Sequence, residues 1–147
     1  MHELYDVGYQ ELRDIELLHK VVKELGALLI DIRFSPRSRD AQWNKSTLEK
    51  RFGESYLHLK ELGNKHYHGG EIEFVDLDAG LDFVAAELEK RPVILMCACW
   101  QRSSCHRFLA VKAFEERYGV SSIQMTTSRA NEIAGRTQPK QLDLFGG

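Results

Sequence analysis

The residues most capable of chemistry lie between Cys97 and Arg107, where the chain reads Cys-Ala-Cys-Trp-Gln-Arg-Ser-Ser-Cys-His-Arg. We predict that a buried strand ends in this segment and that a helix begins in it, because an apolar run precedes it and a helical pattern follows. The first turn of a helix attracts anions through its free N–H groups and partial positive charge. Cys105 would lie in that field beside His106. Arg102 and Arg107 add positive charge, so the Cys105 thiol should be unusually acidic. The segment is therefore expected to bind a phosphate or to present a thiolate nucleophile.

The same segment contains three thiols and one imidazole, a ligand set that suits zinc: Cys97, Cys99, Cys105 and His106. Their spacing matches neither a zinc ribbon nor a zinc finger. Free cysteines are also common as small core residues, and we prefer that interpretation for Cys97. We therefore predict no metal and no cofactor, which leaves Cys105 and His106 as candidates for catalysis.

A second pair of reactive side chains follows another predicted strand. Asp31 and Arg33 are two residues apart at the end of the apolar run 27–32, so they should point to the same side. One interpretation is a carboxylate for acid–base catalysis beside a guanidinium that binds phosphate. The other is a structural ion pair that ties down the following loop. That loop supplies two further candidates for phosphate binding, Arg37 and Ser38.

The elements that must position these residues alternate between strands and helices. The expected strands are 4–9, 27–32, 56–59, 93–99 and 122–125. The first expected helix is 11–25, and the second is capped by Asn44 or Ser46 and ends at residue 52. A third begins after a cap at Asp76 or Asp78 and is stopped by Pro92, and a fourth is capped by Ser103 or Ser104 and reaches residue 118. A short helix is expected after Thr127 or Ser128. The alternation predicts a single three-layer α/β domain with a mainly parallel sheet.

Parallel strands place their carboxyl ends along one edge of a sheet, and ligands bind in open α/β sheets at that edge. Gly8 and Tyr9 follow the first expected strand, Asp31 and Arg33 follow the second, and the 97–107 segment follows the fourth. We therefore expect these residues to converge on one site.

Composition limits the class of protein. A chain of 147 residues, 43% of them hydrophobic, predicts one globular domain, over residues 1–134. The longest apolar run is too short to span a bilayer, and no basic-then-apolar leader precedes the first strand. Three cysteines, an odd number, predict reduced thiols in the cytoplasm and no disulfide framework.

The formal net charge of −2 conceals an uneven distribution. Basic residues outnumber acidic ones in 33–68 and in 102–140, whereas acidic residues dominate 69–91. If the two basic stretches share a face, that face would meet phosphates, as in DNA. The alternative is an ordinary solvated surface, which is also how we interpret the histidines at positions 58, 66 and 68.

The last seven residues read Gln-Leu-Asp-Leu-Phe-Gly-Gly and resemble the bacterial sliding-clamp-binding motif. Two adjacent apolar anchors and a glutamine amide suit a peptide that docks on a partner, and burial of the anchors is worth roughly 3–6 kcal/mol before the ordering entropy is subtracted. Residues 135–140 predict a flexible linker, so 135–147 would form a linker and tail. The residues expected to bind the clamp are Gln141, Leu142, Leu144 and Phe145. The alternative is that this stretch packs on the domain as a last strand.

The domain as a whole resembles the domain-of-unknown-function family 488. The resemblance runs from about Leu4 to about Met125, and it is carried by Gly8-Tyr9, Asp31-Ile32-Arg33, Pro36-Arg37-Ser38, Glu61-Leu62-Gly63, Leu95-Met96-Cys97-Ala98 and Cys105-His106-Arg107. It implies an α/β fold with these motifs gathered in one pocket, and it implies no established reaction. An acidic residue commonly follows the Cys-Ala pair in the family, whereas this chain has Cys99.

These observations favour a cytoplasmic DNA-maintenance protein that the sliding clamp recruits. Its cationic pocket would act on a nucleotide or a damaged base, for example by hydrolysis of a flipped base. The residues expected to take part in catalysis are Asp31, Cys105 and His106. Those expected to bind substrate or phosphate are Gly8, Tyr9, Arg33, Arg37, Ser38, Arg102 and Arg107. Two alternatives stay open: a DNA- or nucleotide-binding module without catalysis, and a thiol or phosphoryl enzyme of small metabolites whose tail match is accidental.

Overall fold

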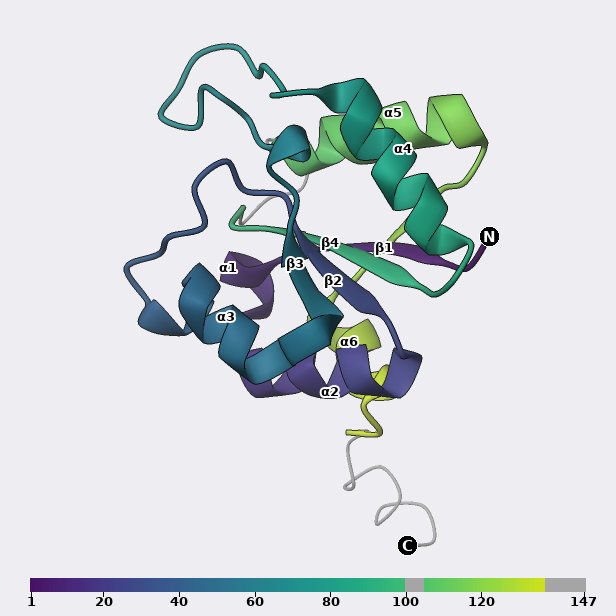
Figure 1. The fold of residues 1–147 in the computed structure, drawn as a ribbon. Helices are drawn as coiled ribbons and strands as arrows, with labels where there is room; N and C mark the ends of the chain where they lie inside the picture. Colours follow the sequence, from purple (N-terminus) through teal and green to yellow (C-terminus); the bar gives the residue numbers. More distant parts are fainter. Residues whose placement is uncertain (100–104, 137–147) are drawn as a thin grey trace, which may run out of the picture.

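The structure is a computed structural model, and it describes residues 1–99 and 105–136. Its centre is a five-stranded, wholly parallel sheet in the order β3-β2-β4-β1-β5 (Figure 1). The strands are β1 (Leu4–Gly8), β2 (Leu28–Asp31), β3 (Tyr56–His58), β4 (Val93–Cys97) and β5 (Ser122–Gln124). The predicted α/β class and parallel sheet are confirmed.

Helices cover both faces of this sheet, as Figure 1 shows. One face carries α1 (Tyr9–Leu12), α2 (Ile15–Leu25), α3 (Lys45–Phe52) and α6 (Thr127–Ile133), and the other carries α4 (Leu77–Leu88) and α5 (His106–Tyr118). Short 3-10 turns occupy Ala41–Trp43, Gly53–Ser55 and Lys60–Leu62. Each face has its own apolar core, because alternate residues of the strands point to opposite sides. Within the described part of the chain, no helix is both long and apolar enough to cross a membrane.

The first helical region is divided in two, whereas the sequence predicts one helix over 11–25. Arg13 adopts a left-handed conformation with φ 61°, and Asp14 then begins α2, its carboxylate accepting a hydrogen bond from the Leu17 amide at 3.0 Å. Aspartate is among the best residues at this position, so a local cap outweighs the continuity of the apolar pattern. Gly26 ends α2 in the left-handed conformation, as expected.

The carboxyl ends of β2 and β4 form the natural binding position of this sheet. The two strands are neighbours, but the chain leaves β2 toward the face of α3 and leaves β4 toward the face of α5 (Figure 1). Such a divergence opens a crevice between the strand ends, where α/β proteins bind their ligands. The polar residues that follow these two strands are therefore in a position to line a site.

Candidate functional site

A cavity of about 600 Å³ lies at this crevice. Residues from the loop after β2, from the 64–72 loop, from the end of β4 and from the start of α5 line it. Those that matter below are Arg33, Phe34, Arg37, His66, Tyr67 and His106, with Cys99 and Cys105 in its wall. Its size is in the range of small-molecule sites.

Arg33 is held in place by a fully buried carboxylate. Asp31 accepts hydrogen bonds from Nε of Arg33 at 2.8 Å and from its Nη2 at 2.6 Å, and from the hydroxyl of Tyr56 at 2.6 Å. Nη2 also donates to the main-chain oxygen of Trp43 at 2.7 Å. Asp31 has no exposed surface, so it does not line the cavity itself. This geometry is that of the structural ion pair, which fixes the guanidinium at the cavity, whereas an acid–base role of Asp31 stays a prediction.

The pKa shifts in this group keep the Arg33 guanidinium charged and the Tyr56 hydroxyl protonated. Burial on its own would lower the pKa of Arg33, but the hydrogen bonds and the charge of Asp31 outweigh burial and raise it. Burial, followed by the charge of Asp31, raises the pKa of Tyr56, so its hydroxyl stays protonated and keeps donating. Among the described residues, Nη1 of Arg33 has a single long hydrogen bond, to the Tyr9 hydroxyl at 3.4 Å. Nη1 therefore keeps a hydrogen for a ligand.

His106 bridges α5 and the end of β2. Its Nε2 lies 2.8 Å from the main-chain oxygen of Ile32. A carbonyl only accepts, so Nε2 carries the hydrogen and Nδ1 faces Sγ of Cys105, 3.8 Å away. Burial lowers the pKa of His106, and the charge of Arg107 lowers it further, whereas the bond to Ile32 and the charge of Asp31 oppose this shift. The ring is thus neutral at pH 7.

Aromatic rings form the outer wall of the cavity. Phe34 and Tyr67 stack with their centroids 5.5 Å apart, and Tyr67 is 52% exposed. Nζ of Lys60 lies 4.7 Å from the centre of the Phe34 ring. The 64–72 loop is held in shape by Asn64, whose side-chain oxygen accepts from the amides of His66 and Glu73, each at 3.0 Å. Phe34, Tyr56 and Tyr67 are not among the site residues predicted from the sequence, because no local pattern shows that these rings meet the β2 loop.

Tyr9 and Ser38 line a second cavity, of about 550 Å³, next to the first. Tyr9 stacks on Trp43 with ring centroids 4.6 Å apart, and its ring also lies 5.2 Å from the guanidinium of Arg33. The structure thus brings Arg33, Cys105 and His106 to one cavity, whereas Tyr9 and Ser38 line another, and Arg33 touches the Tyr9 ring between them.

Arg107 and Gly8 lie beneath the site and do not line the larger cavity. Arg107 is 1% exposed, and its Nε is 3.3 Å from the Asp6 carboxylate on β1. A Cβ on Gly8 would meet the Cys99 main-chain oxygen at 2.0 Å and Nη1 of Arg107 at 2.9 Å. Gly8 is thus needed for the close approach of the chain that leaves β4. The expectation that Arg107 lies in one cleft with Arg33 is not met.

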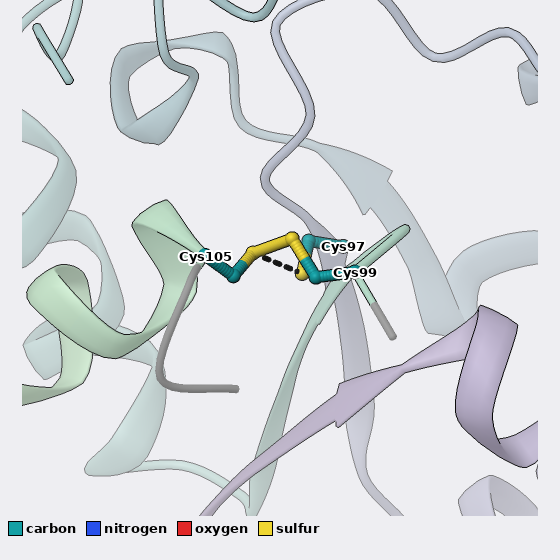
Figure 2. Close-up of side chains that lie close together, drawn as sticks. All are labelled: Cys97, Cys99 and Cys105. Atoms are coloured by element: carbon teal, nitrogen blue, oxygen red, sulfur yellow. Dashed lines mark hydrogen bonds between the residues drawn. A yellow bond between two sulfur atoms is a disulfide. The ribbon is translucent and has the colours of Figure 1, made fainter. Parts of the chain in front are cut away.

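The three cysteines gather in one cluster at the wall of the cavity. Cys99 and Cys105 are joined by a disulfide, and Sγ of Cys97 lies 2.9 Å from Sγ of Cys105 (Figure 2). The predicted reduced thiols are therefore wrong for Cys99 and Cys105, because β4 and the start of α5 bring together two thiols that are six residues apart in the sequence. Cys97 is free and buried, and burial raises its pKa to about 11. The preferred interpretation of Cys97 as a small core residue fits its burial.

The remaining candidates lie outside the described residues. These are Arg102, in the segment between β4 and α5, and the tail residues Gln141, Leu142, Leu144 and Phe145.

A comparison with known protein families matches one segment of the chain, which contributes part of this site. Residues 15–69 match the model of a family described as "Domain of unknown function DUF488". No curated protein and no solved structure matches the chain significantly. The matched segment is less than half of the chain and runs from α2 through β3 into the 64–72 loop, so it includes Asp31, Arg33 and Tyr56 but not the cysteine cluster. Over this segment the chain is similar to the family that the sequence motifs indicate.

Proposed function

We propose that this chain is a DNA-maintenance protein that the bacterial sliding clamp recruits through its C-terminal tail, and that the cavity between β2 and β4 takes up a nucleotide or a damaged base. The observation that carries the proposal is the combination, in one cavity, of a fixed cation, Arg33, and an exposed one, Arg37, with the stacked rings of Phe34 and Tyr67, of which Tyr67 is exposed. This is the pair of features with which proteins hold a phosphate and a base at the same time.

The phosphate would lie near Arg33 and Arg37. Arg33 is fixed by Asp31 and keeps an available Nη1, whereas Arg37 is exposed at the rim. Arginine is suited to this role because its planar guanidinium matches the geometry of phosphate oxygens. His66, whose Nδ1 is bonded to the main-chain oxygen of Glu71 at 2.8 Å, lines the same space.

The base would stack on the exposed ring of Tyr67. This ring packs against Phe34, and the exposed ring of His68, whose centroid lies 4.0 Å from that of Tyr67, would move aside for a base to stack there. A base extruded from DNA, or a single-stranded one, would present such a face. Stacking on an aromatic side chain is worth about 1–3 kcal/mol per base and depends little on its identity.

Two chemical outcomes follow from this arrangement, and one observation separates them. Hydrolysis of a bound base would require Asp31 as general base or oxocarbenium stabiliser, with His106 beside the leaving group. The Asp31 carboxylate, however, has no exposed surface and is engaged by Arg33 and Tyr56. This burial favours the second candidate, a module that binds the nucleotide without turnover and in which Asp31 positions Arg33.

The test is the binding of nucleoside monophosphates and of a single-stranded oligonucleotide to the full chain over a series of salt concentrations. Arg37→Ala should weaken binding of the oligonucleotide and reduce its salt slope by about one, because one phosphate contact is lost. Tyr67→Ala should weaken binding by about 1–3 kcal/mol with the salt slope unchanged, because stacking releases no counterion.

Lys23→Ala is the matched control, because Lys23 is an exposed cation at the end of α2, far from the carboxyl ends of the strands. It should bind as the wild type does. Wild-type protein that binds no nucleotide, or equal losses in Arg37→Ala and Lys23→Ala, would contradict the cavity as the binding site.

A further inference from the structure

The cysteine cluster takes no part in the proposed nucleotide binding, but its three sulfurs lie close together. The sulfurs of Cys97, Cys99 and Cys105 all lie within 4.8 Å of one another. Two of them come from the end of β4 and one from the start of α5, and in Figure 2 all three side chains point toward a common centre. A tetrahedral zinc ion with Zn–S bonds of about 2.3 Å needs sulfurs roughly 3.8 Å apart, so only small side-chain rotations separate the cluster from a ligand set.

His106 supplies what a fourth ligand requires. Its Nδ1 lies 3.8 Å from Sγ of Cys105, close to the sulfur–nitrogen separation in a tetrahedral zinc site. Its other nitrogen, Nε2, is bonded to the main-chain oxygen of Ile32 at 2.8 Å. Metal-binding histidines almost always give their second N–H to a carbonyl or carboxylate, which fixes the ring and the tautomer. This ring is already fixed with its lone pair toward Sγ of Cys105. It lies outside the group of ligand atoms that are all within 4.8 Å of one another, so the ring must shift to complete the set.

The surroundings compensate the charge of such a centre. Three thiolates, one neutral imidazole and Zn²⁺ carry a net charge of −1, and the buried guanidinium of Arg107 lies close to the main chain of Cys99, since a Cβ on Gly8 would meet both. The main-chain amide of Arg107 donates to Sγ of Cys105 at 3.4 Å, from the N-terminal turn of α5. N–H groups of this kind stabilise a thiolate.

We infer that Cys97, Cys99 and Cys105, in their reduced form, bind one zinc ion together with Nδ1 of His106. Loading requires the Cys99–Cys105 disulfide to open. A dithiol supplies the two electrons and two protons for this step and becomes a disulfide itself. Zn²⁺ then displaces the protons of three thiols, which pass to solvent, while the imidazole binds through its lone pair. The disulfide form holds no zinc, because two of its ligands are bonded to each other. The site is therefore a metal centre whose occupancy depends on redox state.

Zinc content is measured without any nucleotide, so this test does not depend on whether the cavity binds one. Full-length protein is reduced anaerobically with a dithiol, freed of the reductant, mixed with one equivalent of Zn²⁺ and passed through a desalting column. Elemental analysis should find one zinc per chain, and thiol titration of the native loaded protein should find all three thiols protected. The same protein carrying its disulfide should retain no zinc. Co²⁺ in place of zinc should give intense sulfur-to-cobalt charge-transfer bands.

Variants then identify the ligands. Cys97→Ser, Cys99→Ser and Cys105→Ser should each lower zinc affinity by at least about tenfold and reduce the cobalt charge-transfer intensity, because each removes a thiolate. His106→Gln should weaken binding and shift the cobalt spectrum while the charge-transfer bands remain. The matched control is His58→Gln: His58 also holds its ring against a main-chain oxygen, that of Arg33 at 2.6 Å, whereas it is His106 whose other ring nitrogen faces Sγ of Cys105.

Reduced wild-type protein that keeps its circular dichroism and yet retains no zinc would overturn the inference. So would a folded Cys97→Ser protein that holds zinc as tightly as the wild type. The wild-type measurement does not depend on whether any variant folds.

Discussion

His106 on α5 donates its Nε2 hydrogen to the main-chain oxygen of Ile32 at the end of β2, across 2.8 Å. This bond joins the two chain segments that diverge at the crevice of the sheet, and it sets the direction in which the other ring nitrogen points. The larger cavity, the cysteine cluster and the end of β2 therefore share one structural element. A change at His106 should affect each of them.

The stability of the protein should fall in mild acid through His106. Burial lowers the pKa of this ring in the folded state below the value of about 6.5 that it has when unfolded. The unfolded state then binds more protons as the pH falls, so the contribution of neutral His106 is present above about pH 6.5 and is lost as the pH falls through the folded pKa. Urea unfolding between pH 7.5 and pH 5 should show this loss in the wild type and a smaller one in His106→Gln. His68→Gln, a change at an exposed ring, should keep the wild-type slope; the same slope in all three proteins would contradict the assignment.

Asp31→Asn should destabilise the fold strongly, because it leaves the charge of Arg33 buried without its partner. The loss expected for a broken buried ion pair is about 3–5 kcal/mol in urea unfolding. Tyr56→Phe removes one hydrogen bond to the same carboxylate and should cost less, about 1.5–3 kcal/mol. Equal stability of Asp31→Asn and the wild type would show that the pair does not support the fold.

If the cavity catalyses hydrolysis, Asp31→Asn should also lower turnover at least tenfold, about 1.4 kcal/mol in the barrier, with DNA binding retained. If Asp31 acts by positioning Arg33 in a binding module, binding itself should weaken and wild-type protein should yield no product. The measurement is product formation on a panel of damaged duplexes beside a binding curve for each protein.

Thiol counting should report the redox state of the cluster. Native protein with its disulfide should show no thiol that reacts readily at pH 8, because Cys97 is buried and its pKa is raised to about 11. Unfolding in urea should expose one thiol, and unfolding after reduction should expose all three. Rapid reaction of Cys97 in the native protein would show that the cluster is more accessible than its burial indicates.

The tail should act as a separate unit. The double change Leu144→Ala and Phe145→Ala should abolish binding to the sliding clamp, for which we expect a wild-type Kd of order micromolar, while the melting temperature stays the same. Fluorescence anisotropy and a thermal melt measure the two quantities. A double change at Thr137 and Gln138, in the expected linker, is the control and should leave clamp binding intact. A large fall in the melting temperature of the Leu144 and Phe145 variant would place the tail in the core.

The amino-acid sequence by itself determined the class of fold. Buried parallel strands are apolar on both faces, and capped amphipathic helices carry their own start and stop signals, such as Asp76 before α4 and Gly26 after α2. These are local signals, and they predicted the five strands to within a few residues. The rule that strand ends meet at one edge then placed Arg33, Cys105 and His106 near one another.

Only the tertiary structure decided what each polar residue does there. Asp31 faces Tyr56 from the neighbouring strand, Arg107 turns inward to Asp6, and Cys105 meets Cys99. Each contact depends on the register between strands and on the direction from which α5 approaches the sheet, and residues distant in the sequence set both. Burial then set the direction of the pKa shifts of Tyr56, Cys97 and His106, because desolvation is the largest cause of each.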